Sequence, residues 1–214
     1  MVGKINSLFK NEQNYNAKDF ILFILERLHK ELKKNININN NNNNSNVMNN
    51  INVYDKKSVI NNVYSEFTKQ WSIISDLFFG FYETTKICLN CIKSDNYLIK
   101  NTSIIYNYEL FKYITLPLED IKKNIINYNE INNKITIKDC FNYIQKDILL
   151  NEENKIFCKN CQQTNYIFSS KIYLSPNILI LVLERGKENN INFEIKENID
   201  LTEFILQKDK PQII

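Results

Sequence analysis

Two cysteine pairs with identical spacing constrain this sequence more than any other feature. Cys88 and Cys91 enclose two residues, and Cys158 and Cys161 enclose two residues in the same way. A two-residue gap lets both sulfur atoms of a pair face one ion from a tight turn, and two such turns complete a tetrahedral shell of four thiolates. This ligand set is typical of Zn(II), and it leaves no open position for a catalytic water. The spacing therefore predicts a structural zinc site.

Two other interpretations of the cysteine pairs stay open. The cysteines can belong to two unrelated turns, or each pair can be a redox-active C-x-x-C motif. Neither alternative accounts for the duplication, and no thioredoxin-like βαβ pattern surrounds either pair. The segment between the pairs, at positions 92–157, is much longer than the one in a compact zinc finger. In a zinc ribbon here, the two cysteine turns would therefore be separated by a long inserted segment that contains strands and a helix.

The composition is that of a soluble globular protein and argues against several classes of function. Hydrophobic residues make up 43% of the chain and charged residues 24%, and a net charge of +3 gives no reason to expect nucleic acid or a membrane as partner. The longest apolar runs, at residues 20–25 and 178–183, are too short to cross a bilayer. Residues 1–10 lack the apolar centre of a secretory signal. We therefore expect an intracellular protein, cytoplasmic or nuclear, without a disulfide framework.

Asparagine is heavily over-used in the first third of the chain, and residues 39–44 are asparagine without interruption. Such a stretch has few apolar side chains to bury, so we expect residues 35–65 to form a disordered insertion. A milder stretch at residues 122–133 is interpreted in the same way. The alternative for the longer stretch is an aggregation-prone interaction tract.

Two segments carry helix signals. From residue 17 to residue 34, apolar residues recur at three- and four-residue spacing, and Asn16 and Asp19 suit the start of a helix. A second helix is predicted to begin near Thr136, because Thr136 and Asp139 together form a capping box.

The fifth cysteine and the single histidine are the remaining candidates for catalytic chemistry. Cys140 lies on the apolar face of the second predicted helix and is interpreted as a small core residue. His29 lies near the end of the first predicted helix and is interpreted as a surface or packing residue. We therefore assign no catalytic role to either residue.

Strand patterns fill much of the chain around the cysteine pairs. The segments expected to be extended are residues 67–88, as strands or as a short helix leading into a strand, and residues 103–108, 111–116, 166–174, 178–183 and part of 193–206. Pro117 is expected to end one of these strands, and a turn is expected at residues 175–177. Helices flanking antiparallel strands predict an α+β fold and not a βαβ repeat.

Five segments, together with the paired cysteines, resemble motifs of ubiquitin-specific protease catalytic domains in the order of that family. They are residues 16–20 (NAKDF) with 28–32 (LHKEL), similar to D-A-x-E-F … L-H-E-E-L; residues 75–80 (SDLFFG), which lead to the first cysteine pair; residues 136–141 (TIKDCF), similar to S-L-x-D-C-L; residues 174–185 (LSPNILILVLER), similar to L-P-x-x-L-x-x-x-L-x-R; and residues 199–201 (IDL), similar to L-D-L. The resemblance extends from near residue 14 to near residue 206.

The resemblance implies part of a papain-like cysteine protease with a palm, a thumb and antiparallel β zinc-ribbon fingers that grip ubiquitin. In this scheme residues 14–34 form a thumb-type helix, residues 70–175 the fingers with an inserted helix, and residues 176–206 palm strands. It also implies hydrolysis of the peptide or isopeptide bond after the C-terminal glycine of ubiquitin, with Zn(II) as a structural cofactor.

The sequence departs from that family at three places. The nucleophile box G-L-x-N-x-G-N-T-C-Y is expected ahead of Asn16 and the histidine box G-H-Y after the last strand, and neither occurs in the 214 residues. Asn16 itself stands where the family has an aspartate for the basic tail of ubiquitin, so the charge-assisted pairing is lost. We expect the chain to be the central part of the domain and to be inactive alone.

Three functions follow from these observations. The first is a segment of a deubiquitinating cysteine protease, and the second is a non-catalytic ubiquitin-binding or scaffold protein with a zinc ribbon. The third, a zinc-ribbon protein that binds nucleic acid, is disfavoured, because the lysines near the cysteine pairs are accompanied by glutamates. These charged residues are Lys86, Lys93, Lys155 and Lys159 together with Glu83, Glu152 and Glu153.

Overall fold

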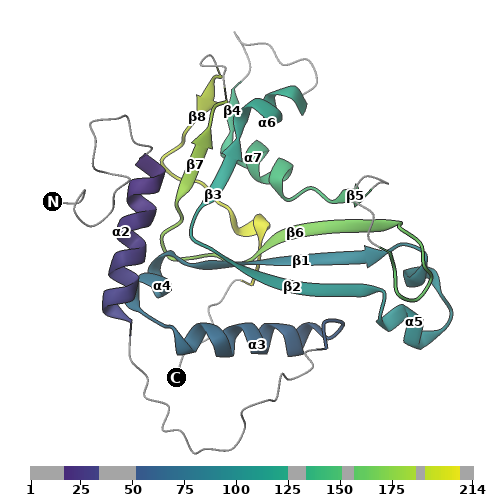
Figure 1. Cartoon of the computed structure of the whole chain (residues 1–214). Coiled ribbons are helices and arrows are strands. Elements are labelled where there is room, and N and C mark those ends of the chain that lie inside the picture. Colours follow the sequence, from purple (N-terminus) through teal and green to yellow (C-terminus); the bar gives the residue numbers. More distant parts are fainter. Residues whose placement is uncertain (1–16, 34–51, 125–133, 151–156, 187–190, 208–214) are drawn as a thin grey trace, which may run out of the picture.

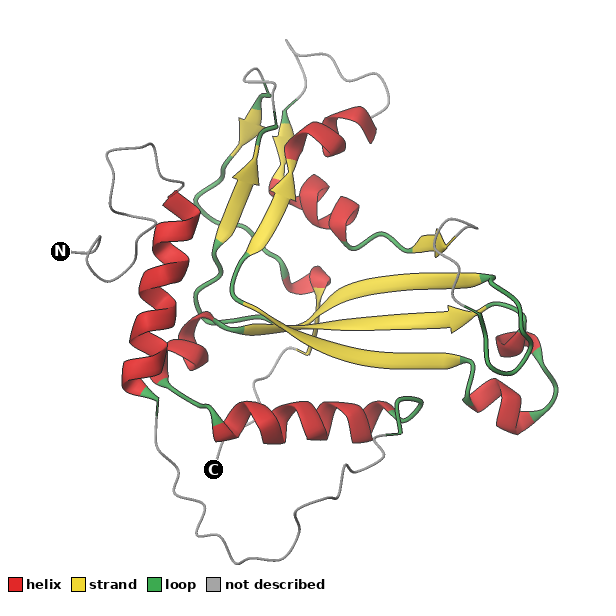
Figure 2. Ribbon diagram, viewed as in Figure 1, coloured by secondary structure: helices red, strands yellow, loops and turns green. Residues whose placement is uncertain are grey.

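An antiparallel ribbon formed by the three long strands β1 (Gly80–Cys88), β2 (Ile104–Phe111) and β6 (Tyr166–Leu174) extends from the rest of the molecule (Figures 1 and 2). The computed structural model describes residues 17–33, 52–124, 134–150, 157–186 and 191–207. β1 is central and pairs with β2 on one side and β6 on the other. The short β5 (Ile148–Leu150) pairs with β6 antiparallel, and β9 (Ile205–Gln207) pairs with β6 in parallel. The predicted antiparallel strands are confirmed.

Two pairs of short parallel strands lie next to the base of the ribbon. β3 (Ile114–Pro117) pairs with β7 (Leu181–Glu184), and β4 (Ile135–Thr136) pairs with β8 (Phe193–Glu194). Pro117 is the last residue of β3, as expected. The parallel pairing was not predicted, because β3 and β7 are far apart in sequence and their local patterns do not reveal their partners.

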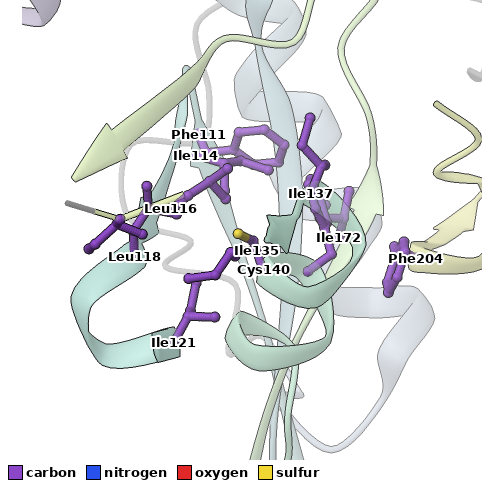
Figure 3. Close-up of a cluster of buried hydrophobic side chains, with 12 residues drawn as sticks. Phe111, Ile114, Leu116, Leu118, Ile121, Ile135, Ile137, Cys140, Ile172 and Phe204 are labelled. Atoms are coloured by element: carbon purple, nitrogen blue, oxygen red, sulfur yellow. The ribbon is translucent and has the colours of Figure 1, made fainter. Parts of the chain in front are cut away.

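The main hydrophobic core lies between these short strands, α6 (Leu118–Asn124) and α7 (Ile137–Ile144) (Figure 3). It buries the side chains of Phe111, Ile114, Leu116, Leu118, Ile121, Ile135, Ile137, Cys140, Phe141, Ile172, Ile191 and Phe204. Cys140 is fully buried, and burial raises the pKa of its thiol to about 12. Its predicted role as a small core residue is confirmed.

The start of α7 follows from the local sequence. The Thr136 hydroxyl accepts the backbone N–H of Asp139 at 3.2 Å, and the Asp139 carboxylate accepts the backbone N–H of Thr136 at 2.8 Å. This reciprocal pair satisfies two backbone donors that a helix start leaves without partners. The predicted capping box is therefore confirmed.

The first described helix, α2 (Ala17–Leu32), packs against α4 (Ile73–Phe78) (Figure 1). His29 Nδ1 lies 2.6 Å from the Ser72 hydroxyl, and the His29 ring lies 5.2 Å from the Phe79 ring. Burial, and then the neighbouring charge of Lys112, lower the pKa of His29. His29 is therefore a packing residue, as predicted, whereas Asn16 and its predicted capping role lie outside the described residues.

The helix α3 (Lys56–Lys69) corrects part of the expectation that residues 35–65 are disordered, because residues 56–65 of that range are helical. It runs beside β2, and its residues Val59 and Ile60 are buried together with Tyr108 of that strand. The Asp55 side chain caps the helix by accepting the N–H of Lys57. The high asparagine content led to a prediction of disorder, although Val59 and Ile60 belong to a helical apolar pattern that packing against β2 stabilises. Residues 34–51 and 125–133, in the two asparagine-rich stretches, lie outside the described residues.

Three shorter helical segments complete the described chain. α5 (Tyr97–Asn101) and η2 (Cys91–Lys93) lie at the far end of the ribbon, and η4 (Thr202–Phe204) precedes β9. The Asn96 side chain caps α5 by accepting the N–H groups of Leu98 and Ile99. No helix among the described residues is both long and apolar enough to cross a membrane.

Candidate metal centre

The four paired cysteines meet at the far end of the ribbon, although the whole segment at positions 92–157 separates the two pairs in sequence. Cys88 is the last residue of β1, and Cys91 is the first residue of η2. Cys158 and Cys161 belong to the turn that leads toward β6. The antiparallel register of β1 with β6 places Cys88 opposite Tyr166, and this pairing brings the second turn to the first.

The first turn is fixed by backbone hydrogen bonds to both neighbouring segments. The N–H of Cys88 donates to the carbonyl of Ser103 at 2.9 Å, and the N–H of Leu89 donates to the carbonyl of Asn165 at 2.9 Å. Past the second cysteine of the pair, the N–H of Ser94 donates to the carbonyl of Cys91 at 3.0 Å. The polypeptide therefore holds this pair in place through bonds that do not involve the thiol groups.

The second turn closes on itself. The N–H of Gln162 donates to the carbonyl of Cys158, and the N–H of Cys158 donates to the carbonyl of Gln163, both at 2.9 Å. Closing the turn places Gln162 in the left-handed region with φ of 57°, which is unfavourable for a residue with a side chain. The Asn160 amide donates to the Thr102 hydroxyl at 2.8 Å and so links this turn to the end of α5.

The sulfur positions fit a tetrahedral metal site. The Sγ atoms of Cys88 and Cys161 are 3.6 Å apart, as are those of Cys91 and Cys158, and all four lie within 4.8 Å of one another. Four sulfurs at about 2.3 Å from a central Zn(II) would lie about 3.8 Å apart. A disulfide needs an S–S distance of about 2.05 Å, so the four cysteines are free thiols. The four residues predicted from spacing are therefore brought together and can hold a metal ion.

Burial and hydrogen bonds change the pKa values of three of these thiols in different directions. Cys88, Cys91 and Cys158 are buried, and burial raises the pKa of Cys88 and Cys91. At Cys158 burial also acts to raise the pKa, but hydrogen bonds outweigh it and lower the pKa to about 6. These bonds come from the backbone N–H of Cys161 and the Tyr166 hydroxyl, among others. Negative charge is therefore stabilised on the sulfur of Cys158 and disfavoured on the sulfurs of Cys88 and Cys91.

Sequence reasoning did not identify the residues that support the cysteines. Tyr166 is buried beside the cysteines, and Ile99 and Leu150 pack against them. Tyr166 carried a usable signal, because it begins a predicted strand a few residues after the second pair. Ser103 and Asn165 contribute only backbone carbonyls, which no side-chain pattern can reveal.

Comparison with known families gives a match over nearly the whole chain. The family described as "ubiquitin carboxyl-terminal hydrolase" matches residues 1–213. Ubiquitin carboxyl-terminal hydrolase 12 of Saccharomyces cerevisiae is 26% identical over 191 residues, which is 81% of this chain and 14% of the yeast protein. Ubiquitin carboxyl-terminal hydrolase 2 of Gallus gallus is 27% identical over 209 residues, which is 93% of this chain and 52% of the chicken protein. The chain thus spans about half or less of these relatives.

Solved structures support the same fold. The SAGA Ubp8/Sgf11/Sus1/Sgf73 DUB module bound to ubiquitin aldehyde matches with a TM-score of 0.57 and 17% identity, over 98% of this chain and 37% of the matched chain. A SAGA DUB module bound to monoubiquitin matches with a TM-score of 0.54 and 17% identity, over 90% of this chain and 34% of the matched chain. The predicted α+β fold with an antiparallel ribbon is confirmed. Given the match over residues 1–213, the chain belongs to the ubiquitin carboxyl-terminal hydrolase family.

Proposed function

We propose that the chain is the central part of the catalytic domain of a deubiquitinating cysteine protease. The complete domain would bind ubiquitin and hydrolyse the peptide or isopeptide bond after its C-terminal glycine. The observation that carries this proposal is the family match over residues 1–213, together with the four cysteines gathered at the end of the ribbon. The similar DUB modules solved with ubiquitin aldehyde and with monoubiquitin support ubiquitin as the partner.

The proposed division of labour follows the segments of the fold. Residues 14–34 would form the thumb-type helix, residues 70–175 the fingers, and residues 176–206 strands of the palm. α2 supports this division by exposing large apolar side chains: Phe20, Ile21, Leu28 and Leu32 are each between 39% and 49% exposed. An apolar helix face of this kind is suited to packing against further polypeptide of the thumb.

The metal in this proposal is a structural Zn(II) bound by Cys88, Cys91, Cys158 and Cys161. Four thiolates fill a tetrahedral shell, so the ion would fix the ends of the fingers and would not activate water. Zinc analysis should give one ion per chain for the wild type and a loss for Cys88→Ser. Cys140→Ala is the matched control, because Cys140 lies in the main core and should leave the zinc content unchanged. Full zinc content in Cys88→Ser would overturn this assignment.

The nucleophile and the base of the protease are proposed to come from polypeptide outside this sequence. His29, the only histidine in the sequence, contacts the hydroxyl of Ser72 and no cysteine. Cys140 is buried with a raised thiol pKa, the opposite of an activated nucleophile. The chain alone should therefore bind ubiquitin without hydrolysing its conjugates.

A ubiquitin probe with a C-terminal thiol-reactive group tests the proposal in native extract. Peptides of this chain should be found by mass spectrometry in a covalent adduct that is heavier than the sum of this chain and ubiquitin. In parallel, the purified chain should perturb the NMR spectrum of ¹⁵N-labelled ubiquitin. The protease proposal fails if the native protein has the mass of this chain and is absent from every adduct.

The second candidate is a non-catalytic ubiquitin-binding or scaffold protein. It is favoured by one observation: no cysteine–histidine pair occurs among the described residues, where His29 contacts Ser72 instead. This candidate would replace the protease if a native protein with the mass of this chain binds ubiquitin and is absent from every adduct. Absence of ubiquitin binding as well would exclude both.

A further inference from the structure

A buried carboxylate lies in β1, the central strand of the ribbon, five residues before Cys88 of the candidate metal centre. Glu83 of β1 has a side chain that is only 9% exposed. Its Oε2 atom lies 2.7 Å from the Lys56 ammonium of α3 and accepts the Tyr108 hydroxyl of β2 at 2.6 Å. A buried carboxylate is costly unless it is paired and hydrogen-bonded, and both of these contacts meet that need.

Aromatic rings complete the surroundings of the ammonium group. The Lys56 Nζ atom lies 5.9 Å from the centre of the Tyr106 ring and 5.8 Å from the centre of the Tyr173 ring. The Tyr108 and Tyr173 rings meet edge to face with their centres 4.9 Å apart. Both cation distances lie within the range in which the negative face of a ring attracts a cation. The ammonium is therefore held by one carboxylate and two ring faces.

Lys56 lies at the end of its helix where a positive charge is unfavourable. Lys56 is the first residue of α3, and the dipole of a helix disfavours a cation at that end. Four residues around the ammonium, here called the cage, offset this effect. They come from all three long strands: Glu83 lies on β1, Tyr106 and Tyr108 lie on β2, and Tyr173 lies on β6. The Lys56 side chain is 45% exposed, so the site opens to solvent.

We infer that Glu83, Tyr106, Tyr108 and Tyr173 form a binding site for a primary alkylammonium group. In this chain Lys56 occupies the site and thereby fixes the first turn of α3 to the ribbon. The assignment rests on the four side chains and their distances from Lys56, and it does not depend on the proposed protease function.

The test removes the ammonium group of Lys56 by mutation and then adds an alkylammonium ion to the solution to replace it. Lys56→Ala deletes the atoms that correspond to n-propylammonium. We expect the Tm of this variant to fall by about 2–6 °C. Adding n-propylammonium chloride should restore most of the loss, because a ligand that binds only the folded state stabilises it. The matched control is Lys57→Ala, which removes the adjacent exposed lysine and should show neither the loss nor the response.

Further variants distinguish binding of n-propylammonium at these four residues from a general effect of salt on stability. Glu83→Gln or Tyr173→Leu, added to Lys56→Ala, should abolish or weaken the response to n-propylammonium. Equal recovery with sodium chloride, or an equal response in Lys57→Ala, would overturn the inference. If Lys56→Ala does not fold, Lys56→Met and Lys56→Arg provide the comparison, because both keep the stem and only arginine keeps the charge. A lower Tm for methionine supports the site, and equal Tm values overturn it.

Discussion

The base of the molecule, which is the region of the short parallel strands with α6 and α7, and the far end of the ribbon are stabilised in different ways. At the base, twelve buried residues of the described chain form one core, with further apolar residues packed around it. At the far end, the described part of the chain has one small buried cluster, which is formed by Cys88, Cys91, Cys158 and Tyr166. A cluster this small contributes little hydrophobic free energy, so the far end needs a different source of stability.

Exposure of side chains shows the same contrast. Tyr97 and Leu98 of α5 are each 73% exposed, beside the candidate metal centre. In the core at the base, Leu116, Leu118 and Phe141 are completely buried. On the proposal of a structural zinc site, a metal held by the four cysteines would take the place of a hydrophobic core at the end of the ribbon, whereas the base has an apolar core of its own.

The largest expected effect is loss of structure at the end of the ribbon after metal removal. A Cys₄ zinc site contributes on the order of 10 kcal/mol to folding of its surroundings. Chelation, or the variant Cys88→Ser, should therefore expose the backbone amides of residues 88–103 and 158–166 to rapid hydrogen exchange. Amides of α7 should keep their protection, because that helix belongs to the main core. Simultaneous loss of protection in α7 would contradict the independence of the two regions.

The second effect should occur at the base. Phe141 is fully buried, with its ring 5.3 Å from that of Phe204. Phe141→Ala should lower the free energy of unfolding by about 3–5 kcal/mol, measured by urea denaturation. The control Tyr97→Ala, at an exposed position, should change it by less than about 0.5 kcal/mol. If Phe141→Ala also released bound zinc under native conditions, the two regions would be a single cooperative unit.

The sequence predicted the fold best where the signal was local. The capping box of Thr136 and Asp139 predicted a helix start near Thr136, and Thr136 is the N-cap of α7. By contrast, α3 was missed because the asparagine content of the region outweighed the helical spacing of Val59, Ile60 and Val63. The parallel pairing of β3 with β7 depends on contacts between distant segments, and local periodicity contains no information about such partners.

The candidate site followed the same rule. Duplicated spacing identified all four cysteines, because the chemistry of a metal site limits which residues and gaps can serve. The contacts that support the cysteines could not be predicted from the sequence, because Asn165 acts through its backbone carbonyl and Asn160 through a hydrogen bond to the distant Thr102. The ion pair between Lys56 and the buried Glu83 was also missed, because the two residues lie on different elements.

A third effect should appear where the ribbon meets the base. A Cβ atom added at Gly80 would lie 2.4 Å from the Phe111 ring and 2.7 Å from the carbonyl oxygen of Leu174. Gly80→Ala should therefore cost about 1–3 kcal/mol of stability. Phe111→Leu removes one of the two clashes, so a double-mutant cycle by urea denaturation should show favourable coupling. Additive effects would mean that the strand shifts to accommodate the alanine.

The smallest expected effect concerns the turn of the second cysteine pair, and its sign is the opposite of the others. Gln162 adopts a left-handed conformation that glycine adopts without strain, so Gln162→Gly should stabilise the metal-bound turn by about 0.5–1 kcal/mol. Competition with a chromogenic chelator should then show zinc affinity that is roughly two- to five-fold higher. Gln163→Gly is the matched control, because no positive φ occurs at that described residue, and added backbone freedom should lower the affinity instead. Lower affinity in Gln162→Gly would show that the side-chain hydrogen bond from Gln162 to the carbonyl of Lys159 outweighs the relief of strain.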